Sequence, residues 1–252
     1  MRTGWHSVGL EVDGPYDLLA EVAGHLPPFY DDQQPVVAAA RLFAEGDGYA
    51  LEVDGERPSR FVPTYPTLLD VANLLELTVV ERLPDLVAVH AGAVALDGRA
   101  LLLPGSTQTG KTRLVTALLE QGATYLSDEF VLLDEHGRVH AYPRLLALRE
   151  DEQVRRVDAT TFGAAPSDGS YPVGAVALLT YDAQVSGLEA EGLSASSVWL
   201  HLMEHCISVH RRPQASLATL TTVAATATGL RGRRGDAAKT LLSAQGLLPA
   251  MS

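Results

Sequence analysis

The sequence predicts a mixed α/β protein in which a small β-rich module precedes a larger α/β domain. Three observations predict this organisation. The first third of the chain combines short apolar segments with many turn signals, a helical pattern closes it, and a glycine-rich loop near the middle lies between a strand and a helix. We therefore expect two domains, residues 1–85 and residues 86–252.

The composition is that of a globular protein with a sizeable core, since 46% of its 252 residues are hydrophobic and 20% are charged. The formal net charge of −12 disfavours binding to nucleic acid, because a polyanion is repelled. No apolar run reaches the roughly 18 residues of a membrane span, and the first residues lack the layout of a signal peptide. We expect a cytoplasmic protein without a membrane partner. The single cysteine, Cys206, is expected to be a buried, unreactive thiol.

Local signals define the elements of the first module. Residues 48–63 indicate a β-hairpin with its turn at Asp54-Gly55. An amphipathic helix is expected to begin near Pro66 and to end before Pro84. Its apolar residues recur at helical spacing, namely Leu68, Val71, Leu75 and Val79.

The second domain alternates strands and helices. A hairpin turns at Asp97-Gly98, its second strand leads into the glycine-rich loop, and the helix after the loop is stopped by Gly122. A strand, a turn at His136-Gly137 and another strand follow. The remaining expectations are irregular structure at 145–172, a buried strand at 173–181, and helices at 194–209 and 235–248.

The glycine-rich loop, GSTQTGKT at residues 105–112, matches the pattern G-x-x-x-x-G-K-[ST]. In this pattern the backbone N–H groups wrap phosphate oxygens, the lysine reaches the β and γ phosphates, and the Ser/Thr hydroxyl completes a Mg²⁺ shell. The alternative is a chance match, which the flanking strand and helix disfavour. We expect the nucleotide to be bound by Gly105, Ser106, Thr107, Gln108, Thr109, Gly110, Lys111, Thr112 and Arg113.

Three further side chains frame this loop. Asp128 and Glu129 stand at the end of an apolar run soon after it. A bend there would direct both toward the phosphates, so that one carboxylate holds Mg²⁺ and the other takes the proton of an attacking hydroxyl. A polar strand end that faces water is the alternative. His90 lies in an apolar strand one hairpin before the loop, and is either a satisfied core residue or an imidazole near the transferring group.

These features in this order resemble the HPr kinase/phosphorylase family. The matching segments are HAGAV, GSTQTGKT and LSDEFV, followed by HAYPRLLALRE and, more weakly, ATTFGAA, and together they cover residues 86–182. Within that wider family the sequence looks closer to the HPr-kinase-related proteins, including kinases found with ribosomally made peptides such as lasso peptides. The resemblance implies a PEP-carboxykinase-like α/β fold and transfer of a phosphate from a nucleoside triphosphate to a serine-type hydroxyl.

The resemblance also implies a role for each matching residue. Lys111 and the loop amides would bind the phosphates, and Thr112 with Asp128 would hold Mg²⁺. Glu129 matches the second acid of the family's pair, a candidate general base. His90 matches the histidine near the γ-phosphate, which neutralises charge or relays a proton.

Arg144 in YPRLL is a candidate clamp on a phosphate or on the acceptor, with a structural ion pair as the alternative. The sequence departs from the family at three positions. Gln108 and Thr109 replace small residues in the middle of the loop, and Glu129 is one methylene longer than the family's aspartate. No segment matches the motif associated with the phosphorylase reaction, so we expect kinase activity only.

The leading functional hypothesis is an ATP-dependent kinase that acts on a Ser/Thr hydroxyl of a peptide or small protein. A metabolite kinase and a nucleotide-binding regulator with little turnover are the alternatives. The acidic pair favours chemistry over binding alone. Two basic runs, at 210–212 and 231–234, could attract an acidic peptide or could be solvated surface. Related kinases assemble as homo-oligomers, which makes a homo-oligomer one possibility, but the sequence leaves the oligomeric state open.

Overall fold

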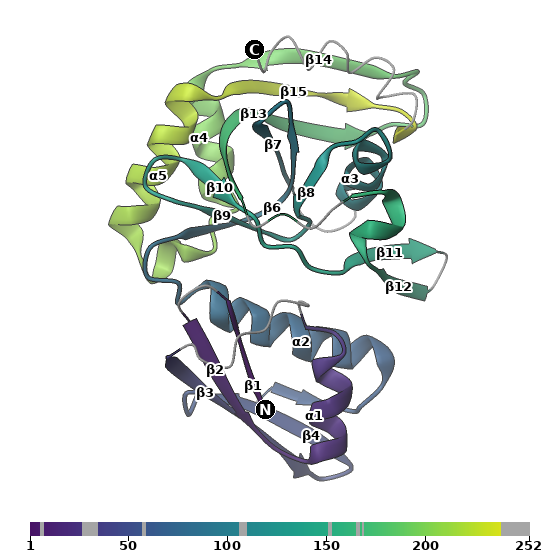
Figure 1. The fold of residues 1–252 in the computed structure, drawn as a ribbon, viewed down its shortest axis with the longest axis vertical. Helices are drawn as coiled ribbons and strands as arrows, with labels where there is room; N and C mark the ends of the chain where they lie inside the picture. Colours follow the sequence, from purple (N-terminus) through teal and green to yellow (C-terminus); the bar gives the residue numbers. More distant parts are fainter. Residues whose placement is uncertain are drawn as a thin grey trace.

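The computed structural model describes residues 1–5, 8–26, 35–56, 59–105, 110–150, 153–164, 167 and 169–237. It is a mixed α/β structure with two parts stacked along the long axis of the molecule (Figure 1). The N-terminal part contains β1 to β5 with α1 and α2, and the C-terminal part contains β6 to β15 with α3, α4 and α5.

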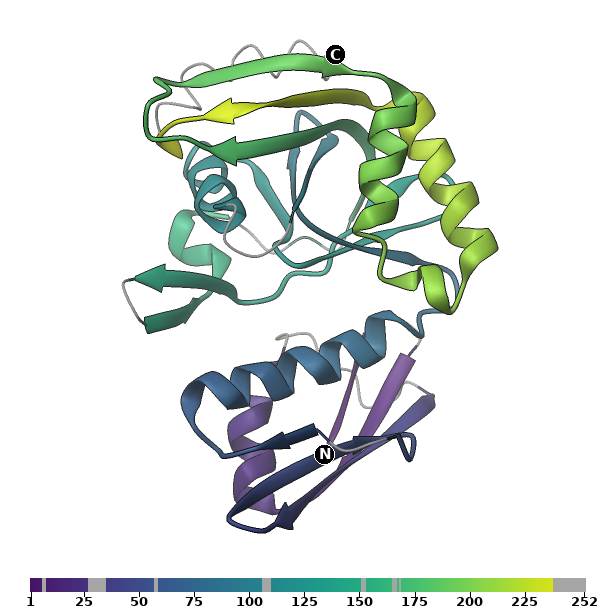
Figure 2. The same ribbon diagram turned by 180° about the vertical axis from the view of Figure 1, so that it is seen from behind.

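The N-terminal part is a five-stranded sheet in the order β1-β2-β3-β4-β5. Its elements are β1 (Arg2–Trp5), β2 (Val8–Asp13), α1 (Tyr16–Ala23), β3 (Val36–Glu45), β4 (Gly48–Val53), β5 (Ser59–Phe61) and α2 (Tyr65–Val80). Only the β2–β3 pair is parallel, and α1 lies in the connection between these two strands. Val8, Leu10 and Val12 are buried on one face of β2, which is apolar and is covered by α2 (Figure 2). On the other face Glu11 and Asp13 are exposed, while Gly9 is buried.

The C-terminal part is built on an eight-stranded sheet in the order β10-β9-β6-β7-β13-β15-β14, with β8 paired to β6. Its strands are β6 (Val87–Leu96), β7 (Arg99–Pro104), β8 (Thr124–Ser127), β9 (Phe130–Leu133), β10 (Arg138–His140), β13 (Ser170–Tyr181), β14 (Leu188–Leu193) and β15 (Thr228–Arg234). A further pairing between β10 and β13 closes β10, β9, β6, β7 and β13 into a ring. Strands β7, β13 and β15 run parallel, so their carboxyl ends meet at one edge.

Helices cover both faces of this sheet. Helix α3 (Lys111–Glu120) packs on one face, whereas α4 (Ala195–Glu204) and α5 (Pro213–Thr226) lie together on the other (Figure 2). Successive residues of β7 serve the two layers. Leu101 and Leu103 contribute to the cluster under α3, and Leu102 contributes to the cluster under α4 and α5.

Both predicted Asp-Gly turns are confirmed. Asp54 has φ 52° and Gly55 φ 76° between β4 and β5, while Asp97 has φ 48° and Gly98 φ 78° between β6 and β7. Positive φ at both central residues is the geometry that matches the twist of a hairpin, and Asp-Gly adopts it at little cost. The helix over residues 65–80, the strand at 173–181 and the helix that begins at residue 195 are confirmed as well.

One expectation differs from the structure, two elements were not expected, and one expected helix is not tested. The segment expected to be irregular contains a hairpin of β11 (Leu146–Glu150) and β12 (Gln153–Val157), followed by a 3₁₀ turn at Ala159–Phe162. Helix α5 and strand β15 were not expected. Helix α5 does carry local signals, because Pro213 stands in its first turn and its buried residues Ser216, Leu220 and Val223 recur at helical spacing. Strand β15 is rich in glycine and arginine and carries no such signal. The helix expected at 235–248 lies almost entirely outside the described residues.

One apolar cluster joins the two parts. Its members include residues of α2 and of the five-stranded sheet, together with Leu86, Ala88, Phe130, Leu132 and Tyr142. Helix α2 therefore packs on β6 and β9 as well as on its own sheet. Within the described ranges, no helix has the length and apolar character needed to cross a bilayer.

Candidate active site

The site forms where β6 changes partners. The first half of β6 pairs with β9 and the second half with β8, and Asp128-Glu129 is the two-residue step between those strands. The Glu129 carbonyl accepts a hydrogen bond from the Ala91 N–H (3.2 Å). In a regular strand, neighbouring side chains point to opposite faces of the sheet. At this break in the ladder, the Asp128 carboxylate contacts Thr112 and the Glu129 carboxylate contacts His90.

The glycine-rich loop connects β7 to α3 above this step. Gly110 has φ 77°, a left-handed conformation that glycine adopts without strain, and α3 begins at the next residue. The Lys111 ammonium donates to the Gly105 carbonyl, so it ties together the two ends of the loop. Ser106, Thr107, Gln108 and Thr109 lie outside the described residues, and their expected contacts stay predictions. Arg113, on the first turn of α3, is exposed.

Thr112 and Asp128 form the first pair of the site. The Thr112 hydroxyl donates to Asp128 Oδ2 at 2.7 Å. Asp128 is 5% exposed, and burial raises its pKa from 3.8 to about 7 against the opposing effect of this hydrogen bond. Its other oxygen, Oδ1, is buried without a hydrogen-bond partner among the described residues. A Cβ at Gly92 would lie 3.5 Å from that oxygen, so the glycine keeps room beside it.

The Thr112–Asp128 pair fits a magnesium ion. A hydroxyl and a carboxylate are hard oxygen donors, and the uncompensated Oδ1 of Asp128 is a site that a cation would satisfy. No cluster of three or more His, Cys, Asp or Glu side chains suited to a metal occurs in the part of the chain that the structure describes. Mg²⁺ is commonly held by one or two protein ligands together with substrate phosphates and water, and this donor set is of that kind.

His90 and Glu129 form the second pair. His90 Nε2 lies 3.0 Å from Glu129 Oε1 and 3.4 Å from Lys111 Nζ. A protonated Nε2 donates to Glu129 and a deprotonated one accepts from Lys111, so the imidazole couples the two groups. The Glu129 side chain is 38% exposed and therefore reachable from solvent. The His90 side chain is 26% exposed and contacts Glu129 and Lys111, so it is not enclosed in the apolar core.

Opposing influences set the charges of these groups. Burial pushes the pKa of Glu129 upward, but the hydrogen bond and charge of His90 outweigh it, with help from Arg144 and Lys111, and the pKa lies below its ordinary value. Burial also lowers the pKa of Lys111, although Glu129 and Asp128 oppose the shift. Glu129 is thus held as a carboxylate close to the ammonium of Lys111.

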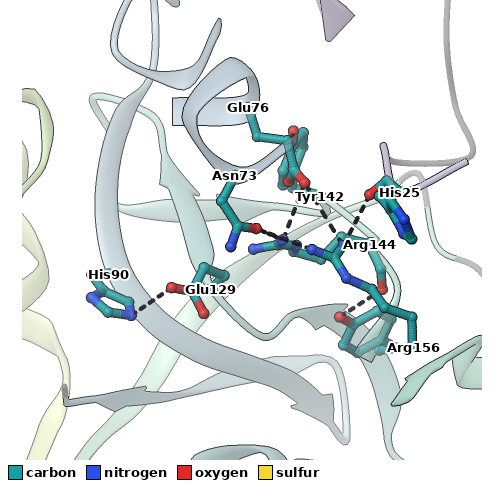
Figure 3. Close-up of polar contacts among 9 residues, drawn as sticks. His25, Asn73, Glu76, His90, Glu129, Tyr142, Arg144 and Arg156 are labelled. Carbon is teal, nitrogen blue, oxygen red and sulfur yellow. Dashed lines mark hydrogen bonds and ion pairs between the residues drawn. The ribbon is translucent and has the colours of Figure 1, made fainter. Parts of the chain in front are cut away.

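Arg144 belongs to a buried network with Asn73 and Glu76 of α2 (Figure 3). Its guanidinium is 3.1 Å from Glu76 Oε1 and 2.8 Å from Asn73 Oδ1, and it covers the ring of Phe130 at 5.2 Å. Arg156 joins the same network through Asn73. Because Arg144 is only 5% exposed and faces Glu76, the geometry favours the ion-pair alternative over a clamp on a phosphate or acceptor.

Two residues near the site carry no signal in the sequence. The His205 carbonyl, at the end of α4, accepts the His90 N–H at 2.8 Å, and the two imidazoles meet edge to face at 6.4 Å between ring centroids. Burial, reinforced by the charges of His90 and Lys111, lowers the pKa of His205. Arg234, the last residue of the run at 231–234, donates to the Gly110 carbonyl at 2.8 Å.

Other arginines of the two basic runs form surface ion pairs or hydrogen bonds to backbone carbonyls. Arg233 pairs with Asp182 and Glu189, and Arg212 donates to carbonyls at Leu83 and Leu86. Cys206 is a buried free thiol, as expected, and burial raises its pKa.

The sequence matches no protein-family model, and no curated protein matches it. Among solved structures, the chain is similar to the HPr(Ser) kinase/phosphatase from Coxiella burnetii. The two are 13% identical, the match covers 64% of this chain and 94% of that one, and the TM-score is 0.35. Any assignment of function therefore depends on the side chains described above.

Proposed function

We propose that this protein is a Mg²⁺-dependent kinase that transfers the γ-phosphate of ATP to a hydroxyl group. The observation that carries the proposal is the convergence of Lys111, the Thr112–Asp128 pair and the His90–Glu129 pair at the N-terminus of α3. A phosphate-binding lysine, oxygen ligands for a divalent cation and an accessible carboxylate are the groups that phosphoryl transfer to a hydroxyl requires.

In this proposal each group has one task. Lys111 and the N-terminus of α3 bind the phosphates, while Thr112 and Asp128 hold Mg²⁺, which supplies neutralisation of phosphate charge. The acceptor oxygen forms a bond to the γ-phosphorus as the bond to the β–γ bridging oxygen breaks, and ADP leaves. Glu129 takes the proton of the acceptor hydroxyl, and His90 holds this carboxylate in place.

The acceptor we propose is a Ser/Thr side chain of a peptide or small protein, on the strength of the sequence resemblance to HPr-kinase-related proteins. A ribosomally made natural-product peptide is one such acceptor. A small hydroxyl metabolite would use the same groups and is the second candidate. A nucleotide-binding regulator is less well supported, because binding alone needs no second carboxylate beside the metal ligands, whereas Glu129 stands there with His90.

The test is transfer of labelled phosphate from ATP and Mg²⁺ to candidate peptides and to hydroxyl metabolites. Lys111→Ala should abolish both nucleotide binding and transfer. Glu129→Gln should retain nucleotide binding and lower transfer by about a hundredfold or more, the usual loss when a general base is removed. Glu135→Gln, an exposed acid in the turn after β9, is the matched control and should behave as wild type. Transfer that survives Lys111→Ala, or tight ATP binding with no acceptor labelled, would overturn the proposal.

A further inference from the structure

Arg234 is an arginine in an unusual environment. It ends β15 and is 3% exposed, whereas its neighbour Arg233 is 61% exposed and pairs with surface carboxylates. The Arg234 guanidinium donates to the carbonyls of Gly110 (2.8 Å) and Gly235 (3.1 Å) and lies 5.6 Å from the ring centroid of Tyr181.

The charge of Arg234 has no ion-pair partner among the described residues, since no carboxylate oxygen lies within 4.0 Å of it. Burying a cation is costly unless an anion compensates it. Burial lowers the pKa of Arg234 even though Tyr181 and the more distant carboxylate of Asp236 favour its charge, and Arg113 adds a like charge nearby. The carbonyl dipoles, the aromatic ring and Asp236 therefore compensate the buried charge only in part. A bound anion would complete this environment.

The position of Arg234 is where an anion is expected. Strands β7, β13 and β15 are parallel and end at one edge of the sheet. The glycine-rich loop follows β7, Tyr181 ends β13 and Arg234 ends β15. In open α/β sheets, ligands bind outside the carboxyl ends of parallel strands. The backbone there is also fixed, because the Arg234 carbonyl accepts the Asp182 N–H at 2.8 Å.

Through its contact with the Gly110 carbonyl, Arg234 can influence phosphate binding without contacting a phosphate itself. The Gly110 carbonyl also accepts the Leu114 N–H (3.2 Å), the first hydrogen bond of α3. The same peptide group carries the N–H of Lys111, which belongs to the set of amides that wrap phosphate oxygens in such loops. By holding this carbonyl from outside, Arg234 fixes the direction of that N–H. A Cβ at residue 110 would overlap the guanidinium, so the approach also requires glycine.

We infer that Arg234 is a positioning residue of the phosphate site: it orients the Gly110–Lys111 peptide group and adds a second positive charge that favours polyphosphate over monophosphate nucleotides. This inference rests on the proposed function, because it assumes that the loop binds a nucleotide. The ligand class is the phosphate chain of a nucleoside triphosphate.

Titration calorimetry with ATP, ADP and AMP tests the inference on the full chain. Arg234→Gln keeps a donor for the Gly110 carbonyl and removes the charge, and Arg234→Lys keeps the charge on a different geometry. We expect Arg234→Gln to weaken ATP binding by about tenfold or more and AMP binding much less, as loss of a charge-assisted interaction predicts. Arg234→Lys should recover part of the loss for ATP. Arg233→Gln, on the same strand, should bind all three as wild type.

Melting temperatures separate positioning from loss of fold. A folded Arg234→Gln variant that binds ATP within twofold of wild type overturns the inference, and so does an equal loss for ATP and AMP. If Arg234→Gln does not fold, Arg234→Lys provides the test. An ATP affinity and salt dependence equal to wild type in that variant would overturn the inference, because the planar guanidinium would then have no specific role. The proposed function fails separately, when wild-type protein and Lys111→Ala bind ATP alike or when no acceptor is labelled.

Discussion

At the scale of single residues, the Asp128 carboxylate is buried beside Thr112 and its pKa is raised to about 7. Between about pH 4 and 7 the folded chain therefore keeps a proton that the unfolded chain has released. Stability falls as the pH rises through this window, and above about pH 7 the full cost of the buried charge is present. The residue proposed to hold the cation is thus one whose buried charge lowers the stability of the fold above about pH 7.

The first prediction concerns Asp128→Asn. The amide can still accept the hydrogen bond from Thr112 but carries no charge. We expect a variant that is more stable than wild type at pH 8, by at most about 4 kcal/mol for a shift of about three pK units. At pH 5, part of the way through the window, the advantage should shrink to about 1.5 kcal/mol. Mg²⁺-dependent transfer should be lost.

Urea denaturation at the two pH values measures this difference, with Asp47→Asn, in an exposed turn, as the control. An Asp128→Asn variant that is less stable than wild type at pH 8 would contradict the prediction.

A second prediction at this scale concerns His90→Gln. In the wild type, His90 is the main influence that holds the pKa of Glu129 below its ordinary value, against burial. A base must be ionised, so the rate falls as the pH drops through its pKa. Without the imidazole, burial dominates and that pKa rises. The acid limb of the pH profile of kcat/KM should therefore move to higher pH, and an unchanged limb would show that Glu129 is not the base.

At the scale of elements, local signals were enough wherever the chain closes a turn on itself. The two Asp-Gly hairpins, helix α2 and the start of α3 after Gly110 were predictable because the residues that define them are neighbours in sequence. The long-range partners were not. Arg144 meets Glu76 from 68 residues away, and Arg234 meets Gly110 from 124 residues away. Only the folded sheet brings such pairs together. From the sequence, Arg144 was therefore open between two roles, and the run that contains Arg234 was open between attracting an acidic peptide and being solvated surface.

The third prediction concerns the contact between α2 and the segment that carries Arg144. Glu76 is 2% exposed and Arg144 5%. Arg144→Met leaves the buried carboxylate of Glu76 with two weaker contacts, the Tyr142 hydroxyl at 3.5 Å and Arg156 at 4.0 Å. We expect a loss of about 3 kcal/mol or more in the free energy of unfolding. The double variant Glu76→Leu with Arg144→Met should recover most of it, because no charge is then left alone.

The control for this prediction is an exposed pair. Arg60 and Glu45 form an ion pair in which the arginine side chain is 75% exposed, and Arg60→Met should change the free energy of unfolding by no more than about 1 kcal/mol. Urea denaturation measures all three variants. Equal free energies of unfolding for Arg144→Met and the double variant would contradict the prediction, because the Glu76 carboxylate would then cost no stability without Arg144.

At the scale of the whole molecule, the core of the five-stranded sheet extends into the C-terminal part, which also has two apolar clusters of its own. The apolar cluster around α2 runs from the five-stranded sheet into β6 and β9, and the expected boundary at residue 85 falls between two of its members, Leu83 and Leu86. Phe130, in the same cluster, directly follows Glu129. Packing of the N-terminal part is thereby coupled to the position of the proposed base, and unfolding of one part exposes apolar surface of the other.

The last prediction is that the two parts unfold together. The chain has two tryptophans, Trp5 in β1 and Trp199 in α4, so each part carries one fluorescent reporter. Trp199→Phe leaves only the N-terminal signal and Trp5→Phe only the C-terminal one. A shared core makes the unfolding transition cooperative. In each single-tryptophan variant, the fluorescence transition should therefore have the same urea midpoint and slope as the transition measured by far-ultraviolet circular dichroism on that variant. An earlier transition at Trp5 alone would mean that the N-terminal part unfolds independently, in which case the α2 contacts do not link it to the site.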